Sequence, residues 1–534
     1  MKKILLTAII ACVIIPLALA AKVVELPKVE KIKSGYSFIK SIELSDTATR
    51  INMSFVHIPG YWVSLDTLYL EIPSRAEKFL PIRYENYVPG VKQTMDESGR
   101  YDLTIVYPPV EASDSTINLI EILKDGSNGF LFEGVRLYTE PAGRYKAHIH
   151  GTHDRKSGFM VVSKSTAVPG EPACLIPVDN REFDYTFTSD TPVFYTLYDG
   201  LGYLSGLFTG VEFLPENEDV QIDLKVFTPG GDLEPIVSAS SDSQTQAFYD
   251  YQLSTNEYYN NSPVVKQLDV LRESNLYYTP RGYELMAIVE EYPEKRDSVI
   301  HEINALGNGN VISEEGQRAE DAMKKFIDEE FSAFKIRKAL EMDNLAGLYA
   351  LLKLARYGNN KKAAIEAYKM GYEGRFPDHP YSVEMDHLCN SSEPVVGNCF
   401  NDFSAPDFEG TVHRLSDLVK GKPALIELWS SMCYPCRKHS MSMIPVYEEF
   451  APKGFTIVGV AREFGDQAQA MKVVGNDGYP WINLVEIDDR NGIWTLYQIQ
   501  NALGGSYLID PDGKIVAVSP SAEEVRAYLE SYYK

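Results

Sequence analysis

Cys433 and Cys436 are separated by two residues, a spacing at which two thiols can form a disulfide with each other. An apolar run at residues 424–428 precedes them and is typical of a buried strand. The pattern predicts that both cysteines lie on the first turn of a following helix, where free backbone N–H groups stabilise a thiolate. We therefore expect Cys433 to be the exposed nucleophile and Cys436 to be the resolving thiol.

The alternative chemistry for this pair is half of a zinc site. Such a site needs two more Cys or His ligands at matching spacing, and the sequence contains no second Cys-x-x-Cys. A single Cys-x-x-Cys between a strand and a helix is typical of thiol-disulfide exchange. We predict a redox pair that requires no cofactor and no metal.

The composition excludes some classes of partner. The chain has 534 residues, which is long enough for about three or four domains. Its formal net charge of −24 repels phosphate backbones and anionic membrane surfaces. We expect no nucleic-acid partner.

Residues 1–20 have the charged start, apolar middle and small-residue end of a secretory signal peptide. A lipoprotein signal that retains Cys12 is the alternative. No later stretch reaches the roughly 18 apolar residues of a membrane-spanning helix. We therefore predict a mature protein of the periplasm or cell envelope, beginning near Ala21, without a transmembrane span.

Export would place the other cysteines in an oxidising compartment, where disulfides persist. Cys389 and Cys399 bracket a polar loop, so we predict a structural disulfide between them. Cys174 lies in an apolar segment and is expected to be a buried, unreactive residue. A regulatory bridge from Cys174 to another cysteine is the alternative.

The rest of the chain must position this chemistry, and its patterning predicts three regions before the dithiol domain. Apolar and polar residues alternate with the two-residue period of strands over residues 22–140 and again over 144–228. We predict a β-sandwich-like domain and a second β-rich domain there. A polar linker follows, and residues 247–390 change to the period of helices, which predicts a helical region with apolar core stripes.

His148, His150 and His153 form the one suggestive cluster outside the dithiol. Residues two apart on a strand share a face, and His153 could fold back as a third metal ligand. The alternative is a partly exposed edge strand with polar side chains. Because the sequence points to no fourth ligand, we predict no metal centre and keep these histidines as weak candidates.

Residues 396–534 alternate strands and helices in the order of an α/β domain. A strand ends at Trp429, a helix runs to Phe450, and a second strand covers residues 455–460. A hairpin at 507–516 turns at Asp512-Gly513, and a final helix begins at Ala522. This order predicts the thioredoxin topology.

At these residues the sequence resembles the TlpA/ResA-like thioredoxins, which are bacterial envelope thiol-disulfide oxidoreductases. The matching segments are 405–408, 415–418, 421–423, 429–437 and 507–515. The resemblance implies substrates that are thiols or disulfides of envelope proteins, and a membrane or periplasmic thiol that supplies electrons. It also implies a substrate-binding surface, formed by Trp429, Tyr434, Pro435, Gly504 and Gly505.

Glu427 occupies the position at which this family keeps a buried acidic residue behind the dithiol. The resemblance implies that Glu427 takes the proton of Cys436 during exchange. The alternative is a glutamate that points to solvent, because side chains alternate along a strand and its apolar neighbours face the other way.

Three residues depart from the family pattern. His439 stands where a glutamate is usual, and we expect its imidazolium to stabilise a thiolate and make the protein less reducing. Gly504 replaces a cis-proline, so we expect a trans or mobile loop there. Met432 replaces a tryptophan and is expected to pack near the sulfurs or fill space.

Two other functions remain open from the sequence. A redox-inert scaffold would bind partners through the β domains, which the missing proline favours and the intact dithiol opposes. A thiol peroxidase would use Cys433 against peroxide. The usual peroxiredoxin environment has a proline seven residues before the cysteine, where this chain has Ile426.

Overall fold

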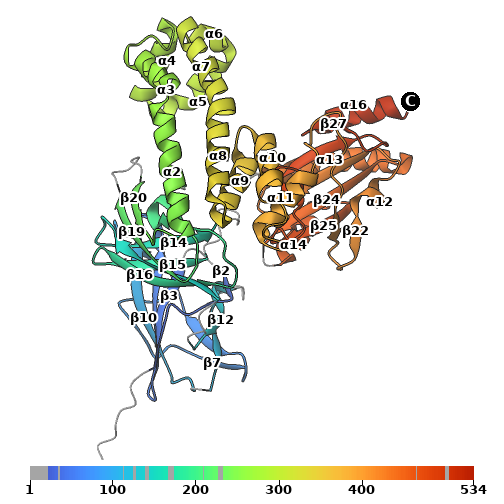
Figure 1. Ribbon diagram of the computed structural model, residues 1–534. Coiled ribbons are helices and arrows are strands. Elements are labelled where there is room, and N and C mark those ends of the chain that lie inside the picture. Colours follow the sequence, from blue (N-terminus) through green and yellow to red (C-terminus); the bar gives the residue numbers. More distant parts are fainter. Residues whose placement is uncertain are drawn as a thin grey trace, which may run out of the picture. The chain divides into compact units, whose positions relative to one another are not determined.

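The structure is a computed structural model that describes residues 22–534, except 34–36, 112, 124–127, 139–143, 166–172, 208–209, 227–232, 465 and 500–503 (Figure 1). The chain divides into two compact units, Met1–Gln246 and Ala247–Lys534. The predicted signal peptide and Cys12 lie outside the described residues.

The first β domain is a sandwich, as its alternating pattern predicts. One sheet contains, in spatial order, β1 (Lys22–Glu25), β3 (Ser37–Leu44), β4 (Thr49–Val56), β10 (Arg100–Tyr107) and β8 (Arg83–Glu85). The other contains β2 (Lys31–Lys33), β12 (Asn128–Arg136), β11 (Thr116–Ile122), β6 (Leu68–Ile72) and β7 (Glu77–Phe79). The inward-facing residues of both sheets form one core, and β5 (Trp62–Val63) pairs with β9 (Gln93–Thr94) beside it.

The second β domain is one eight-stranded sheet with the short helix α1 (Gly200–Leu204). Its spatial order is β18 (Gly210–Phe213), β17 (Tyr195–Asp199), β14 (Ser157–Lys164), β15 (Cys174–Asp179), β16 (Glu182–Ser189), β13 (Tyr145–Thr152), β19 (Glu218–Val226) and β20 (Leu233–Ser238). Because β20 pairs with β19, the domain extends past the predicted boundary at residue 228.

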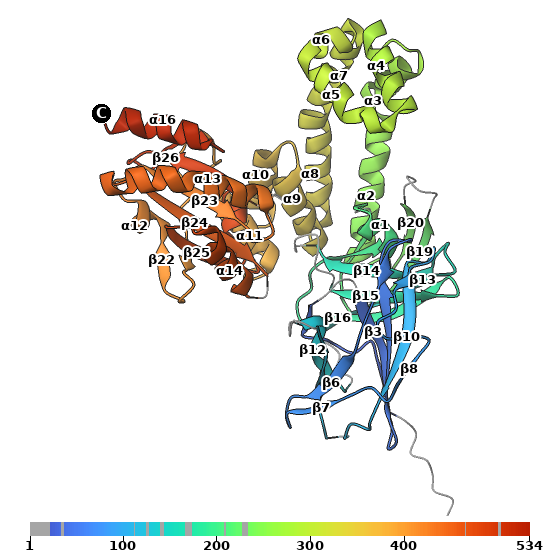
Figure 2. The ribbon, with the colours of Figure 1, turned by 180° about the vertical axis from the view of Figure 1, so that it is seen from behind.

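The helical region begins with α2 (Gln244–Asn261) and continues through eleven further helical segments. These are α3 (Pro263–Glu273), α4 (Pro280–Glu291), η1 (Pro293–Lys295), α5 (Arg296–Leu306), α6 (Asn308–Val311), α7 (Glu314–Lys325), the π-helical turn η2 (Phe326–Phe331), α8 (Ser332–Met342), α9 (Leu345–Tyr357), α10 (Lys361–Gly371) and α11 (Pro380–Asn390). Helices α2 and α8 run side by side in Figures 1 and 2, and Tyr258 stacks on Phe334 between them with ring centroids 3.9 Å apart. This packing agrees with the apolar core stripes predicted for the helical region.

The C-terminal domain has the predicted thioredoxin topology. Its five-stranded sheet has the order β25 (Ile482–Ile487), β24 (Thr456–Glu463), β23 (Ala424–Trp429), β26 (Gly505–Ile509) and β27 (Ile515–Val518). Its helices are α12 (Leu415–Val419), α13 (Tyr434–Phe450), η3 (Ala451–Lys453), α14 (Ala468–Asp477), α15 (Ile493–Leu496) and α16 (Ala522–Tyr532), and β21 (Ser404–Pro406) pairs with β22 (Val412–Arg414) beside the sheet.

Helices cover both faces of this sheet, so the central strand β23 is buried on both sides. Residues Ala424, Ile426 and Leu428 pack toward α12 and α15. Leu425 and Trp429 pack on the other face with α13 and α16, which lie side by side (Figure 2). A strand with two buried faces reads as a continuous apolar run, which explains the pattern at residues 424–428.

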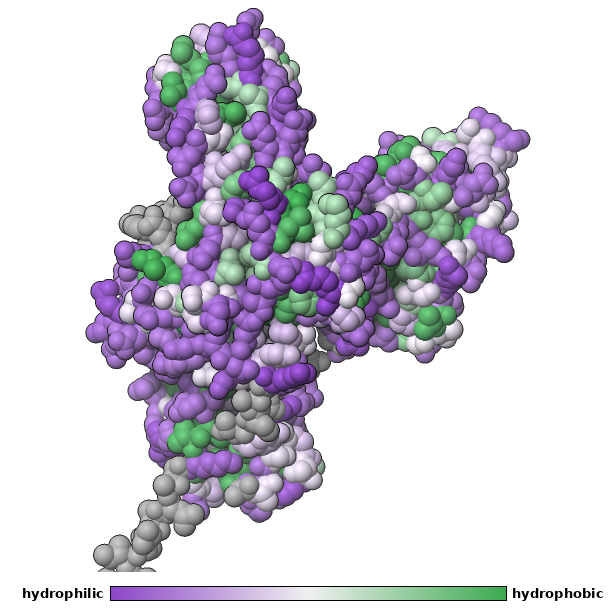
Figure 3. All heavy atoms as spheres, in the orientation of Figure 1, coloured by the Kyte–Doolittle hydropathy of each residue, from purple (hydrophilic) through white to green (hydrophobic). Residues whose placement is uncertain are grey.

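The surface is strongly polar. Hydrophilic residues cover most of the face drawn in Figure 3, as the net charge of −24 predicts. Within the described ranges, no helix has the length and apolar character that crossing a bilayer requires.

Candidate redox site

Cys433 and Cys436 form a disulfide at the point where β23 leads into α13. Cys433 is the N-cap residue of α13, and the backbone N–H of Cys436 donates a hydrogen bond to Cys433 Sγ at 3.2 Å. Pro435 lies in the first turn, where a missing N–H costs no intrahelical bond. The expected placement of the pair at a helix N-terminus is confirmed, and it favours a thiolate on Cys433.

The exposure of the site differs from the prediction. Cys433 is only 5% exposed, whereas Cys436 is half-buried. The neighbouring Met432 and Tyr434 are 84% and 68% exposed, and Pro435 is exposed as well. Met432 therefore does not fill space in the core, and together with Tyr434 it offers a soft, partly aromatic surface beside the disulfide.

Trp429 was predicted to contact substrate, and this is wrong, since its side chain is fully buried. It faces the layer of α13, where its Nε1–H donates to Asn483 Oδ1 at 3.3 Å and its ring packs edge-on against Tyr479. The alternation along β23 turns Trp429 into the core because this face of the sheet is covered.

Glu427 is buried behind the dithiol, and the alternative that it points to solvent is wrong. It lies on the same face of β23 as Leu425 and Trp429, beneath α13, and is 2% exposed. Its Oε1 accepts hydrogen bonds from Ser440 Oγ at 3.2 Å and faces His439 Nδ1 at 2.7 Å. Its other oxygen, Oε2, is buried and has no hydrogen-bond partner among the described residues.

Both ring nitrogens of His439 face oxygen acceptors. Nδ1 faces Glu427 Oε1 at 2.7 Å, and Nε2 faces the backbone oxygen of Pro520 at 2.8 Å. Only the doubly protonated imidazolium can donate from both nitrogens. The hydrogen bond to Glu427 is the main cause that raises the pKa of His439 to about 9. The charge predicted for His439 is thus supported, but it is directed at Glu427 rather than at a sulfur.

Gly504 lies against the disulfide, directly before β26. A Cβ atom at this position would lie 2.1 Å from the backbone oxygen of Leu428 and 3.0 Å from Cys436 Sγ. The following residue, Gly505, pairs with Leu428 in the sheet. The backbone at residue 504 can approach Cys436 Sγ this closely because glycine has no side chain. The predicted mobility of the loop concerns residues 501–503, which lie outside the described residues.

We expect Gly504→Ala to lower the free energy of unfolding of this domain by about 1–3 kcal/mol, because the new methyl group overpacks against Leu428. Chemical denaturation of the oxidised protein measures the change. Gly475→Ala in α14 is the matched control, since a Cβ atom there meets nothing within 4 Å. A helical glycine replaced by alanine in open space should stabilise by about 0.5–1 kcal/mol. Equal effects of the two variants would contradict the close approach at Gly504.

Glu463 is a site residue that the sequence analysis missed. It ends β24, which is parallel to β23, and its carboxylate accepts hydrogen bonds from the backbone N and Oγ of Ser431, both at 2.8 Å. Burial raises the pKa of Glu463. The available signal was its place at the carboxyl end of a strand parallel to β23, because such ends meet at one edge of a sheet. Glu463 fixes the loop that carries Cys433.

Arg437 was also missed. Its guanidinium forms two hydrogen bonds of 2.8 Å with the carboxylate of Asp477 at the end of α14, and Tyr479 Oη donates to the same carboxylate at 3.0 Å. The Arg437 guanidinium lowers the pKa of Asp477. This pair anchors the first turn of α13 to the neighbouring helix, so the position of the dithiol depends on both.

Within the residues that the structure describes, Cys174, Cys389 and Cys399 are free thiols. The predicted disulfide between Cys389 and Cys399 is not formed. Cys389 lies in α11, whereas Cys399 is exposed and its backbone pairs with that of Lys514 in an isolated antiparallel β-bridge. The two residues thus belong to elements that are held by different partners. Cys174 is half-buried rather than fully buried as predicted. Desolvation of its thiol raises the pKa of Cys174 to about 12, which keeps it neutral and unreactive.

The three histidines of the second β domain do not form one cluster. His148 and His150 share a face of β13, which is an interior strand between β16 and β19 and not the expected edge strand. His153 is buried elsewhere, with Nε2 3.0 Å from Asp199 Oδ1 and Nδ1 accepting from the backbone N–H of Arg155. It cannot serve as a third ligand.

A bridged Cys-x-x-Cys at the start of a helix, fed by the central strand of a five-stranded mixed sheet, defines a dithiol protein of the thioredoxin fold. The AhpC/TSA family model matches residues 396–518. The thiol-disulfide oxidoreductase ResA of Bacillus thuringiensis is 32% identical over 154 residues, which cover 29% of this chain and 86% of that protein. By this similarity the chain belongs, through its C-terminal domain, to the ResA thiol-disulfide oxidoreductases, and it is an enzyme of that class.

Other similar proteins carry related names. The thiol:disulfide interchange protein DsbE of Pseudomonas aeruginosa is 31% identical over 129 residues, covering 23% of this chain and 68% of that protein. The thioredoxin domain of a thiol-disulfide oxidoreductase from Bacteroides vulgatus is 28% identical and covers 26% of this chain and 99% of that structure, with a TM-score of 0.25. Each of these matches covers less than a third of this chain.

Proposed function

We propose that this protein is exported and exchanges disulfides with other proteins of the cell envelope through Cys433 and Cys436. The observation that carries the proposal is the bridged pair at the N-terminus of α13, with the Cys436 N–H on Cys433 Sγ. A thiolate formed on Cys433 is stabilised by this hydrogen bond and by the helix dipole. The N–H of Cys436 donates to Cys433 Sγ and therefore does not stabilise a thiolate on Cys436 itself.

The exchange proceeds in two balanced steps. The Cys433 thiolate attacks a substrate disulfide, a mixed disulfide forms and one substrate thiolate leaves. The Cys436 thiolate then attacks Cys433 Sγ, which releases the second substrate thiolate and restores the Cys433–Cys436 bridge. Two electrons have passed to the substrate, and a thiol partner returns them. Glu427 is the group that receives the proton of Cys436, because its Oε2 is buried without a hydrogen-bond partner among the described residues.

The surface around the sulfurs suits protein substrates. Met432 and Tyr434 are the exposed residues that flank Cys433. A flexible thioether and an aromatic ring can pack against varied apolar groups on a partner. The signal-like pattern of residues 1–20 supports an envelope location for this exchange.

The test is a redox titration of the mature protein in dithiol buffers, in which free thiols are alkylated and identified by mass spectrometry. We expect Cys433 and Cys436 to change together and reversibly, as a two-electron couple, while Cys174 stays unmodified in the folded protein. The midpoint tells whether the protein acts as a reductant or an oxidant. A pair that stays locked in one state across the titration would overturn the proposal and favour a redox-inert scaffold.

A further inference from the structure

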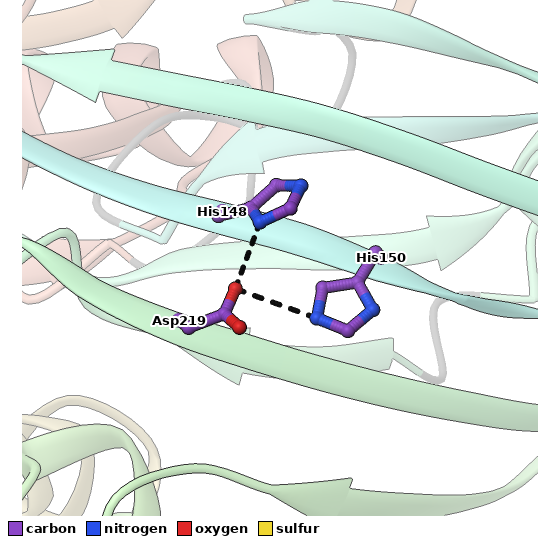
Figure 4. A group of neighbouring side chains, drawn as sticks. All are labelled: His148, His150 and Asp219. Atoms are coloured by element: carbon purple, nitrogen blue, oxygen red, sulfur yellow. Dashed lines mark ion pairs between the residues drawn. The ribbon is translucent and has the colours of Figure 1, made fainter.

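His148, His150 and Asp219 lie together on neighbouring strands of the eight-stranded sheet (Figure 4). The two histidines are two residues apart on β13, so their side chains share one face, while Ile149 between them is buried in the core. Asp219 lies directly opposite His148 on the parallel strand β19. The sheet register itself therefore brings the three side chains together.

The spacing of their donor atoms fits one metal ion. One nitrogen of each histidine and one oxygen of Asp219 all lie within 4.8 Å of one another. Asp219 Oδ1 is 2.8 Å from His148 Nδ1 and 3.4 Å from His150 Nε2. Around a tetrahedral zinc ion with bonds of about 2.0–2.1 Å, neighbouring ligand atoms are about 3.3 Å apart. The two observed distances lie on either side of this value.

A second carboxylate fixes the ring of His148 from the other side. Asp184 on β16 has its Oδ1 3.0 Å from His148 Nε2, while Nδ1 of the same ring faces Asp219. A carboxylate in this position accepts the Nε2–H and so leaves the lone pair of Nδ1 for a metal. This arrangement of carboxylate, histidine and open nitrogen is the outer support that metal-binding histidines need.

We propose that His148 Nδ1, His150 Nε2 and a carboxylate oxygen of Asp219 bind a zinc ion, with Asp184 as the positioning residue for His148. The site faces solvent, since the side chains of His148, His150 and Asp219 are 41%, 29% and 68% exposed, so water completes the coordination. Two imidazoles select zinc or copper over magnesium and calcium, which prefer ligand sets made of oxygen alone. This binding site is independent of the dithiol.

Calorimetric titration of the oxidised protein with zinc chloride tests the site, because the Cys433–Cys436 bridge then cannot bind metal. We expect one zinc ion per chain. His148→Ala and His150→Ala should each abolish this binding, and Asp219→Asn should weaken it at least tenfold. Asp184→Asn should weaken it by about 10–100-fold, as the loss of an outer-shell partner does.

Asp223→Asn is the matched control, because Asp223 lies on the same strand and faces Thr152 rather than a histidine. It should leave zinc affinity unchanged. Cobalt binding gives a second readout, since an intense visible absorption band reports tetrahedral coordination of the bound ion and should disappear in His148→Ala. Zinc that fails to bind, that still binds to the variant lacking both histidines, or that is replaced equally well by calcium would overturn the proposal.

Discussion

Replacing Cys433 by serine is expected to reduce disulfide exchange to the background rate of the buffer thiols, because the attacking sulfur is lost. Replacing Cys436 by serine should leave the first step intact and stop the reaction at a mixed disulfide between Cys433 and the substrate. The reason for this asymmetry is the hydrogen bond from the Cys436 backbone to Cys433 Sγ at the start of α13, which stabilises a thiolate on Cys433 alone.

The measurement is trapping on a non-reducing gel, followed by mass spectrometry of the cross-linked cysteine. Cys433→Ser is expected to keep the start of α13, since Cys433 is the N-cap residue and serine caps helices well. Cys174→Ser controls for the loss of any thiol and should exchange at the normal rate. If Cys433→Ser traps substrate and Cys436→Ser does not, the roles are reversed. The structure offers a reason for that outcome, because Cys436 is the less buried of the two.

The sequence was sufficient to predict the thioredoxin domain because its local signals agree with its packing. The apolar run at 424–428 marks a strand buried on two faces, and Ser521 with Glu524 forms a capping box at the start of α16. The helical region predicted over residues 247–390 likewise corresponds to α2 through α11, which run from Gln244 to Asn390. Where pattern, caps and turns point to one structure, prediction from residues succeeds.

What failed were predictions that depend on distance in space. The loop between Cys389 and Cys399 looks suitable for a disulfide. Cys389 is held in helix α11, however, and the backbone of Cys399 pairs with Lys514 in an isolated β-bridge, so the two residues belong to separate elements. His153 is close to His150 in sequence, yet Asp199 on another strand binds it. Asp219, and not His153, is the neighbour of His148. It lies 69 residues beyond His150 in the sequence and is brought there by the parallel pairing of β13 with β19, which no local sequence pattern predicts.

The same limit applies around the dithiol. The position of Glu427 was available from the family resemblance, and its burial followed from the two covered faces of β23. The pairing of Glu427 with His439 was not predicted, although both residues were candidates, because the His439 imidazolium was expected to stabilise a thiolate of the nearby dithiol. A histidine one helical turn after a cysteine can turn toward the sheet beneath the helix instead.

Replacing His439 by alanine is expected to lower the free energy of unfolding of the C-terminal domain by about 2–3 kcal/mol near pH 6, because it removes a hydrogen bond to a buried carboxylate. Glu427 then keeps a charge without its cation or takes up a proton. Tryptophan fluorescence follows this domain well, since it contains Trp429, Trp481 and Trp494, whereas Trp62 is the only tryptophan outside it.

The effect of the substitution should depend on pH in one direction. The pKa of His439 is raised from 6.5 to about 9 in the folded protein, so the folded state binds the proton more tightly than the unfolded state. The stabilisation is complete below pH 6.5 and is lost as the pH rises through 9. The difference in stability between the wild type and His439→Ala should therefore shrink over this interval. The oxidised protein is used, so that the two cysteines do not titrate.

A double-mutant cycle with Glu427→Gln separates the ion pair from other effects of losing the ring. If the pair carries the stabilisation, His439→Ala should cost little in the Glu427→Gln background, and His439→Gln should restore only part of the loss, since an amide donates a hydrogen bond without a charge. His301→Ala, at an exposed histidine of α5, controls for the loss of any imidazole and should change neither stability nor its pH dependence. His439→Ala could instead lower the free energy of unfolding equally at all pH values and also in the Glu427→Gln background. The ring would then act through packing and the Pro520 contact, and Glu427 would not be held as a carboxylate by an imidazolium.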